Sequence, residues 1–381
     1  MDKNIVKKVL TFKSGQFIFS RKFPVEKLSN SLVEARVLYS TIIDLPILPE
    51  LATQIAQIEE DLIIKSIFGT AAIEGNPLTE EKVAEILSKP ESGEKLKRAE
   101  KEIRNLKSAY DFIVNLQPSE SFPELTEDIV KKVHRIITKD IKHEYNIPGQ
   151  YRNHIVNVGN EEHGGVYIPP KILEDIRTLM REFITWINSE EVLKLEPTIR
   201  AGLAHYYLGL IHPFGDGNGR TARIVEALLL QLAGIKYIPV MLSNFYYRNM
   251  NDYFWAFSNS INNKENEITA FLSFILEGFI DSLKVIKERI TFYIRKFALR
   301  DYYAYLRKTK MITQRQHDFL VILLDFLKPF ILRDLFNVSP FNILYRKPSE
   351  RTARRDLKKL HDEKLLLVKN GKYELNLRVL G

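Results

Sequence analysis

Apolar residues recur at helical spacing along most of this chain, and two such runs flank a polar loop. Between residues 198 and 211, one apolar face is formed by Ile199, Leu203, Tyr206, Tyr207 and Leu210. A second run over residues 221–232 repeats this spacing, and Gly234 offers a helix stop. The pattern therefore predicts two helices joined by the loop at residues 212–220.

Further periodic stretches predict helices on both sides of this pair. The expected helices cover residues 32–43, 50–62, 61–74, about 94–115, 126–140, 319–326 and 348–360. Two short β-rich runs, 155–158 and 164–170, flank a polar turn with glycine, which predicts a hairpin. A second hairpin is expected over residues 365–377, because Asn370-Gly371 is a type I′ turn signal. The predicted fold class is mainly α.

Composition narrows the class of protein without naming a reaction. With 381 residues, 45% of them hydrophobic, the chain is long enough for two or three domains. The absence of cysteine excludes disulfides and zinc–thiolate sites. The N-terminus lacks an apolar signal core, and no apolar run reaches the ~18 residues that span a bilayer. We therefore expect a cytoplasmic protein that does not contact a membrane.

The loop between the two strongest helices carries a histidine, a carboxylate, an amide and several glycines. Glycines permit positive φ, so successive N–H groups can form an anion-binding nest, and the loop opens into a helix N-terminus that favours phosphate. Arg220 and Arg223 share a face of the first helical turn. Asp216 suits Mg2+, and His212 can accept a proton near neutral pH. The loop predicts polyphosphate binding; the alternative is an ordinary glycine-rich turn beside a core histidine.

The string from His212 to Arg223 resembles the signature of the Fic family. That signature reads His, Pro or Phe, Phe, a free position, Asp or Glu, Gly-Asn-Gly-Arg, two free positions and Arg, and every constrained position is filled. The resemblance implies transfer of AMP from ATP, with Mg2+, to a Ser, Thr or Tyr hydroxyl of a protein. It implies these roles: His212 as general base, Asp216 as Mg2+ ligand, Gly217, Asn218, Gly219 and Arg220 as phosphate cradle, and Arg223 as ligand of the terminal phosphate. Related Doc-type enzymes phosphorylate instead, but they depart from the complete Gly-Asn-Gly-Arg pattern.

Glu74 is an unusual residue for its position in the chain. It is expected in the last turn of an apolar helix, where a carboxylate faces the negative end of the dipole at a cost of about 0.3–1 kcal/mol. An exposed Glu beside a loop is the plain alternative. Thr70 to Gly75 also resembles the family's inhibitory-helix motif of Ser or Thr, three free positions, Glu, and Gly or Asn. The resemblance implies that Glu74 pairs with Arg223 and blocks productive placement of the terminal phosphate.

Two further segments gain a role through the resemblance. The hairpin beginning after Pro148-Gly-Gln-Tyr-Arg152 resembles the flap that aligns a target segment by strand pairing. The aromatic-rich segment after the second helix resembles the family's adenine pocket, although ordinary core packing explains most of its rings. The residues carried over to the adenine site are Phe245, Tyr246, Asn251 and Tyr253.

The tail combines a basic helix with a hairpin. From Lys284 onward it holds 23 basic and 10 acidic residues, more than the net +8 of the whole chain. On a helix, one face would carry Arg351, Arg354, Arg355, Lys358 and Lys359. The order of elements resembles a winged helix-turn-helix, which implies Arg351, Arg354, Arg355 and Lys358 as DNA contacts. A solvated basic face, DNA contact and protein docking are all left open.

These features predict three domains. Residues 1–115 form a helical region with an inhibitory helix at about 61–75, residues 116–290 a Fic core, and residues 291–381 a winged-helix domain. The expected activity is protein adenylylation restrained by Glu74, with the chain itself as one possible target. Two alternatives remain open: removal of AMP at the same site, and a DNA-binding regulator with a nucleotide-sensing domain. Whether the chain forms a homodimer is left open as well.

Overall fold

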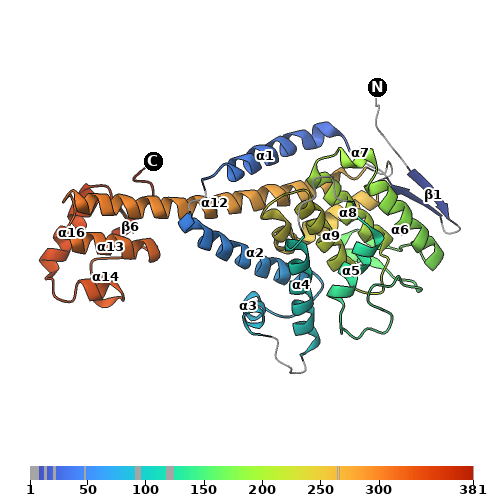
Figure 1. Ribbon diagram of the computed structural model, residues 1–381, viewed down its shortest axis with the longest axis horizontal. Helices are drawn as coiled ribbons and strands as arrows, with labels where there is room; N and C mark the ends of the chain where they lie inside the picture. The colour runs from blue at the N-terminus through green and yellow to red at the C-terminus, as the bar shows by residue number, and fades with distance from the viewer. Residues whose placement is uncertain are drawn as a thin grey trace. The chain divides into compact units, whose positions relative to one another are not determined.

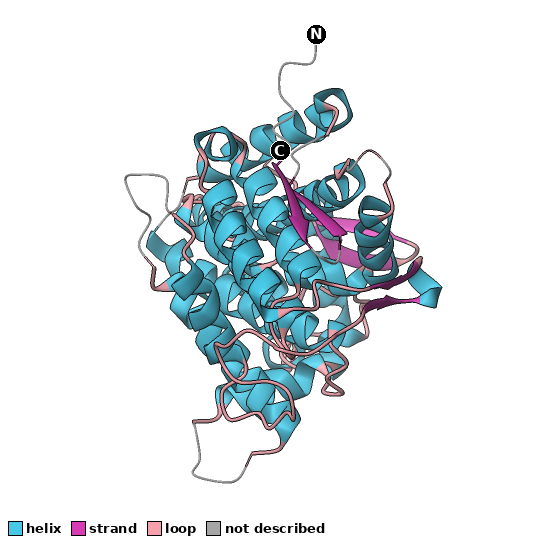
Figure 2. Ribbon diagram, turned by 90° about the vertical axis from the view of Figure 1, so that its right-hand side faces the viewer, coloured by secondary structure: helices cyan, strands magenta, loops and turns pink. Residues whose placement is uncertain are grey.

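The computed structural model is mainly helical, which confirms the predicted fold class (Figures 1 and 2). It describes residues 8–12, 15–19, 23–46, 49–90, 96–116, 124–263, 265 and 267–380. These residues divide into two compact units. The first runs up to Lys287 apart from Pro49–Gln54, and the second comprises Pro49–Gln54 and the residues from Glu288 onward. The predicted three-domain division stays a prediction.

The first unit holds most of the helices. They are α1 (Val25–Ile43), α2 (Ala52–Ile73) from Ile55 onward, α3 (Glu80–Ser88), α4 (Arg98–Val114), α5 (Glu127–Ile137), α6 (Leu173–Ile187), α7 (Glu190–Leu193), α8 (Pro197–Ile211), α9 (Asn218–Leu232), α10 (Leu242–Arg248), α11 (Met250–Ile261) and the first part of α12 (Thr269–Lys308). The strands are β1 (Lys8–Phe12) with β2 (Gly15–Phe19) and β3 (Val158–Asn160) with β4 (Gly165–Tyr167), each pair antiparallel. The 3₁₀ turns are η2 (Glu161–His163) and η3 (Ile238–Val240).

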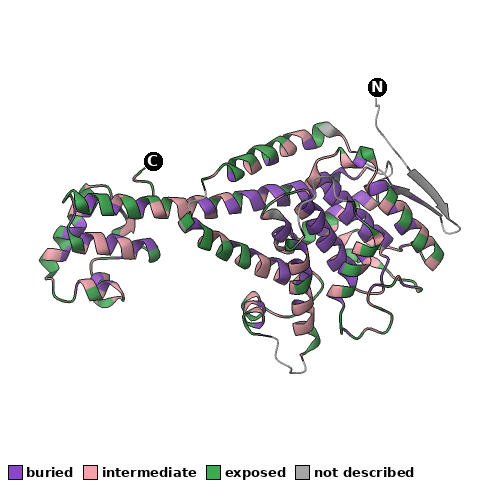
Figure 3. Cartoon of the chain, viewed as in Figure 1, coloured by how far each residue is buried: buried purple, intermediate pink, exposed green. Residues whose placement is uncertain are grey.

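Helices α8 and α9 form the centre of this unit. Both are buried over nearly their whole length, as the purple ribbons of Figure 3 show. Pro197 occupies the first turn of α8, where its missing N–H costs no hydrogen bond. His212 ends α8 in the left-handed region at φ 47°, and Gly217 at φ 78° precedes α9. The two predicted helices and the loop between them are therefore confirmed.

Helix α2 joins two helices that the sequence suggested separately, over residues 50–62 and 61–74. Its second half lies tightly against the segment that begins α10. A Cβ on Gly69 would lie 2.7 Å from the carbonyl oxygen of Ser243, so only glycine permits this approach. The buried hydroxyl of Ser66 donates to the carbonyl of Val240 at 2.5 Å. These contacts fix the end of α2 that carries Glu74.

The second unit has its own apolar core. Its elements are the end of α12, α13 (Gln314–Asp325), α14 (Asp334–Asn337), α15 (Phe341–Leu344), α16 (Glu350–Asp362), β5 (Leu366–Lys369), β6 (Lys372–Leu375) and the 3₁₀ turn η1 (Pro49–Leu51). Side chains from α13, α15, α16 and β5 meet in this core, among them Phe319, Phe341, Leu357 and Leu366. Phe330 pairs with Tyr373 of β6 through two backbone hydrogen bonds of 3.0 and 2.8 Å. The predicted tail hairpin is confirmed, while its winged-helix assignment stays a prediction.

Candidate active site

His212 lies where α8 ends and the polar loop begins. Its Nδ1 is 3.3 Å from the carbonyl oxygen of Gly209, and a carbonyl can only accept a hydrogen bond. Nδ1 therefore carries the ring proton, and Nε2 keeps a free lone pair. Burial lowers the pKa of His212 to about 4. The imidazole is thus neutral at physiological pH and able to accept a proton.

The loop after His212 is closed by its own side chains. Asn218 accepts from the N–H of Phe214 and donates to the carbonyl of Phe214, both at 2.8 Å. The Asn218 amide is therefore committed to holding the loop, and any phosphate contact from this residue must use its backbone. Gly217 and Gly219 flank Asn218 and begin α9, where the first N–H groups of a helix lack carbonyl partners.

Asp216 and Arg220 form an ion pair one helical turn apart. Asp216 Oδ1 lies 2.9 Å from Arg220 Nη2 and accepts from the Gly217 N–H at 2.7 Å. Burial alone would raise the pKa of the Asp216 carboxyl, but Arg220 and the Gly217 N–H hold it below its usual value. Arg220 also lies 3.6 Å from Glu102 of α4. The carboxylate is therefore ionised and held in one orientation.

The second oxygen of Asp216 fits a magnesium ligand. Oδ2 is buried and makes no hydrogen bond to any residue that the structure describes, although Arg98 Nη2 lies 3.5 Å away. Mg2+ takes such carboxylate oxygens and usually completes its shell with phosphate and water. No group of three or more acidic, His or Cys side chains in the described ranges surrounds a common point. Asp216 would therefore be the protein's contribution, with the remaining ligands from phosphate and water.

Glu74 and Arg223 form the ion pair that the sequence predicted. Glu74 Oε1 lies 2.6 Å from Arg223 Nη2, which also donates to the carbonyl of Thr70 at 3.3 Å. The side chain of Arg223 is 1% exposed and that of Glu74 is 30% exposed. Burial alone would raise the pKa of Glu74, but Arg223 and Arg220 hold it below its usual value. Gly75, at φ 83°, turns the chain away after Glu74.

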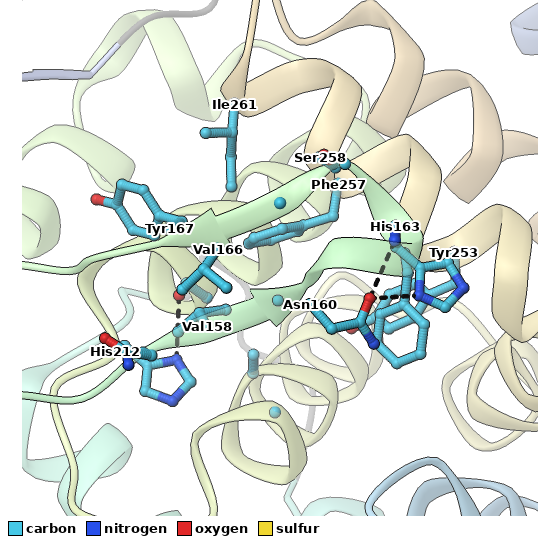
Figure 4. Close-up of a pocket in the computed structure, with 18 of the residues that line it drawn as sticks. Val158, Asn160, His163, Val166, Tyr167, His212, Tyr253, Phe257, Ser258 and Ile261 are labelled. Atoms are coloured by element: carbon cyan, nitrogen blue, oxygen red, sulfur yellow. Dashed lines mark hydrogen bonds between the residues drawn. The ribbon is translucent and has the colours of Figure 1, made fainter.

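Two adjoining cavities meet at His212. The larger, about 470 Å³, is lined by the flap hairpin β3–β4 and by α11 (Figure 4). Arg223 lines it as well. The smaller, about 390 Å³, is lined by the loop from Gly215 to Gly219 and by residues 154–157. His212, Glu74, Gly219 and Asn157 line both cavities. A ligand that fills both would therefore pass the free nitrogen of His212.

The aromatic wall of the larger cavity differs from the predicted adenine site. Tyr253 lines the cavity, but Phe245 and Tyr246 lie in the core, where Phe245 packs on Phe274 with ring centroids 5.2 Å apart. Asn251 is exposed, and its Oδ1 lies 3.1 Å from His163 Nε2 of the flap. The cavity wall is completed instead by residues that follow Tyr253 along α11, namely Phe254, Phe257, Ser258 and Ile261.

A buried polar network lies behind Arg223. Glu226 is bonded through one oxygen to His205 Nδ1 at 3.1 Å and through the other to the Tyr246 hydroxyl at 3.0 Å. His205 Nε2 lies 3.0 Å from the hydroxyl of Tyr253. Burial alone would lower the pKa of Arg223, but Glu74 and Tyr253 hold it above its usual value. The network therefore fixes Tyr253 beside the guanidinium.

Arg152 positions His212, and the sequence did not reveal this role of Arg152. Its guanidinium donates to the backbone carbonyls of His212, His154 and Pro170, each at 2.7 Å. The backbone N–H of Arg152 donates to the carbonyl of Pro213 at 2.9 Å. Burial lowers the pKa of Arg152 to about 10. The side chain of Arg152 thus connects both ends of the flap to the loop. The sequence signal that could have indicated this role was the place of Arg152 shortly after Pro148-Gly149.

His134 of α5 is a second residue that the sequence did not single out. It accepts from the Gly149 N–H at Nδ1, and its Nε2 lies 2.9 Å from the carbonyl of Asp216. Nε2 is therefore the protonated nitrogen, and burial lowers the pKa of His134 to about 4. The ring stacks on Phe214, with centroids 3.7 Å apart. This neutral histidine joins the loop to the segment that precedes the flap.

Fold and site together define a helical protein with a glycine-rich polar loop at the N-terminus of a buried helix. The comparisons with known proteins give that class a name. Residues 124–230 match the model of the Fic/DOC family. This span includes α5, the flap, α8 and nearly all of α9.

Similar proteins include curated adenylyltransferases from animals. The chain is 32% identical to protein adenylyltransferase fic-1 of Caenorhabditis elegans over 180 residues, which are 46% of this chain and 33% of that protein. It is 30% identical to protein adenylyltransferase Fic of Aedes aegypti over 222 residues, 58% of this chain and 40% of that protein. The matches thus span between a third and two fifths of the length of these relatives.

Solved structures share the fold. A Fic family protein from Desulfovibrio desulfuricans G20 aligns with a TM-score of 0.57 at 18% identity, covering 93% of this chain and 97% of that one. Residues 134–508 of Fic-1 from C. elegans align with a TM-score of 0.55 at 22% identity, covering 69% and 72%. In the described part of the chain, every helix is too short or too polar to traverse a lipid bilayer.

Proposed function

We propose that this protein transfers AMP from ATP to a hydroxyl group of a protein side chain. The observation that carries the proposal is His212, whose free Nε2 lies at the junction of two cavities, one with aromatic walls and one formed by the anion loop. The curated relatives named protein adenylyltransferases support the same reaction. ATP would place its base in the larger cavity and its phosphates at the start of α9.

The residues of the chain supply a proton acceptor and fixed positive charge. The target hydroxyl gives its proton to Nε2 of His212, and its oxygen forms a bond to the α-phosphorus while the bond to the pyrophosphate oxygen breaks. Arg220 and the N–H groups at the start of α9 stabilise the charge on the phosphates. Arg223 holds the terminal phosphate, and Asp216 holds Mg2+, which neutralises phosphate charge when bound. Arg152 keeps His212 in position through its backbone carbonyl.

The target would present its hydroxyl beside the flap. The flap strands are three residues each, with Val158 opposite Tyr167. An extended segment that pairs with a strand edge would be held largely through backbone hydrogen bonds, with little dependence on its side chains. Hydroxyl groups of the chain itself are candidate targets as well, because such pairing depends little on side chains. Labelled ATP detects modification of another protein and of the chain itself.

Glu74 restrains this activity in our proposal. Glu74 Oε1 forms an ion pair with Arg223 Nη2 at 2.6 Å. The guanidinium of Arg223 is the group proposed to bind the terminal phosphate. ATP that cannot reach Arg223 would bind with its α-phosphate displaced from His212. Restraint would therefore act on turnover more than on binding.

The test follows label from ATP in the purified chain with Mg2+. ATP labelled at the α-phosphate is compared with ATP labelled at the γ-phosphate, for the wild type and for Glu74→Gly. We expect transfer of the α label only, with Glu74→Gly faster by about tenfold or more, each tenfold being about 1.4 kcal/mol of barrier. Adding Arg223→Ala to Glu74→Gly should remove the gain. Glu85→Gln, which removes an exposed carboxylate of α3, serves as the matched control.

The outcomes separate the competing functions. Transfer of the γ label would replace adenylylation with phosphorylation. If no label moves in any variant, the nucleotide-sensor alternative gains and the enzyme proposal fails. Removal of AMP is favoured by the partial exposure of Glu74 and its place on both cavities, where it can orient water. Loss of AMP removal in Glu74→Gly, without any gain in transfer, would support that reading.

A further inference from the structure

The basic face of α16 is the feature that the proposed function leaves unused. The helix buries four positions at helical spacing, Ala353, Asp356, Leu357 and Leu360. The opposite side exposes Arg351, Arg354, Arg355 and Lys358, while Lys359 is partly buried and pairs with Glu363. Apolar and basic residues therefore occupy opposite faces of α16, as the sequence predicted.

Three of these cations are not neutralised. Arg354 is paired with Glu350 at 2.5 Å. Arg351, Arg355 and Lys358 lie within ion-pair distance of no carboxylate among the residues that the structure describes, and their spacing places them on one stripe. A stripe of free cations along a solvated helix attracts a polyanion with regularly spaced charges.

The exposed acidic residues of α16, Glu350 and Asp362, lie at its two ends, because Asp356 is buried. It is the acidic residue in the middle of α16, and it points inward. Its Oδ2 lies 2.8 Å from Arg315 Nε, and its Oδ1 accepts from Gln316 at 3.0 Å. The hydroxyl of Tyr345 donates to Oδ2 at 3.3 Å. The carboxylate thus fixes α16 on α13 and α15 without reducing the positive charge outside.

The elements around α16 add cations and a projecting hairpin. Arg346 and Lys347, in the turn that precedes the helix, are both exposed. Strands β5 and β6 follow α16, and their turn at Asn370-Gly371 has positive φ at both residues, with Lys372 exposed beside it. Phe330 extends this hairpin by one bridge to Tyr373. The order helix, bridge, helices, basic helix and hairpin is that of a winged helix-turn-helix.

We propose that the second unit binds double-stranded DNA, with α16 in the major groove and the β5–β6 turn beside the phosphate backbone. An α-helix is about 10–12 Å wide, which matches the ~12 Å major groove of B-DNA. The deep, narrow major groove of duplex RNA does not admit a helix in this way. A protein partner fits less well, because protein interfaces exclude charge from their centre and α16 exposes no large apolar residue between Glu350 and Asp362.

The proposal is independent of AMP transfer, and its test uses the full chain. Fluorescence anisotropy with a labelled mixed-sequence DNA duplex is measured between about 50 and about 200 mM salt. The variant carries Arg351→Gln, Arg355→Gln and Lys358→Gln. The control carries Arg300→Gln, Arg307→Gln and Lys308→Gln, which removes the same charge from exposed positions of α12 in the same unit. Circular dichroism and thermal unfolding verify that both remain folded.

We expect the wild type and the control to bind DNA with a steep salt dependence. Each lost phosphate contact lowers the slope of log affinity against log salt by about 0.9, so the α16 variant should show a slope flatter by about two to three and an affinity lower by ~10-fold or more. Absence of DNA binding at the lowest salt, equal loss in the control, or equal affinity for duplex RNA would each overturn the proposal. In the first of these cases, docking of an acidic protein becomes the better explanation.

Discussion

The two units contain arginines in opposite situations. In the first unit, Arg220 and Arg223 are buried and each has a carboxylate partner at 2.9 or 2.6 Å. On α16 of the second unit, Arg351 and Arg355 are exposed and lack such a partner in the described part of the chain. A buried, paired cation contributes to ligand binding through its fixed position. An exposed cation contributes through its charge alone, which salt screens. Single substitutions should therefore have large effects in the first unit and small, additive effects on α16.

The largest effect should come from His212→Ala in the Glu74→Gly background. Loss of a general base costs about 10²–10⁴-fold in rate, so AMP transfer should fall by ~10³-fold. His212 lies at a helix end, and its removal should leave the fold unchanged, as thermal unfolding can verify. ATP affinity, measured by calorimetry, serves as a control because it should change little. Turnover near that of the parent variant would contradict the role of His212 and weaken the contrast between the units.

Arg152→Met in the same background should have the second largest effect. It removes the donors to three backbone carbonyls that hold His212 and both ends of the flap. A misplacement of about 1 Å can cost ~10²-fold in rate, so we expect a loss of that order in kcat with a smaller change in KM for ATP. Arg177→Met, which removes a surface ion pair with Glu174, is the matched control. Equal losses of kcat in the two variants would contradict the role of Arg152 in positioning His212.

A single change on α16 should be much weaker. Arg355→Gln removes one of several exposed cations, so DNA affinity should fall only about two- to fivefold and the salt slope should change by about 0.9. Anisotropy titrations at two salt concentrations measure both quantities. A loss as large as that of the triple variant would mean that Arg355 recognises one particular group, and the contrast between the units would then fail.

The smallest effect should be that of pH between 7 and 5. Burial lowers the pKa of His212 to about 4, so its basic form is fully present above pH 5 and is lost as pH falls through about 4. The rate of AMP transfer should therefore stay nearly constant down to pH 5. With a solvated histidine of pKa about 6.5 as the base, the rate would fall roughly 25-fold over the same range. A profile of that shape would show that the ring is hydrated, with circular dichroism as the control for folding.

The sequence predicted the elements that carry strong local signals. The loop between α8 and α9 was predicted because its glycines, acid and arginines are contiguous, and the partnership of Glu74 with Arg223 followed from one motif on each segment. The cavity wall was predicted less well. Phe245 and Phe257 look alike in sequence, and only the packing of α10 and α11 places the first ring in the core and the second at the cavity.

Residues that act through distant backbone atoms were missed for a related reason. Arg152 and His134 bond to carbonyl or N–H groups that every residue possesses, so no pattern of side chains marks their partners. Their contacts join segments far apart in the chain, and these contacts depend on the tertiary structure. For Arg152, the available hint was its place after Pro148-Gly149.

The close contact of α2 with the start of α10 determines how Glu74 can release Arg223. Gly69 lies against the Ser243 carbonyl, and Ser66 is bonded to Val240, so the end of α2 cannot withdraw without breaking these contacts. Only the side chain of Glu74, which is partly exposed, is free to turn. Rotation of an exposed side chain takes picoseconds to nanoseconds, whereas displacement of a packed helix takes microseconds or longer. In the proposed restraint by Glu74, release of Arg223 therefore requires rotation of one side chain and no displacement of α2.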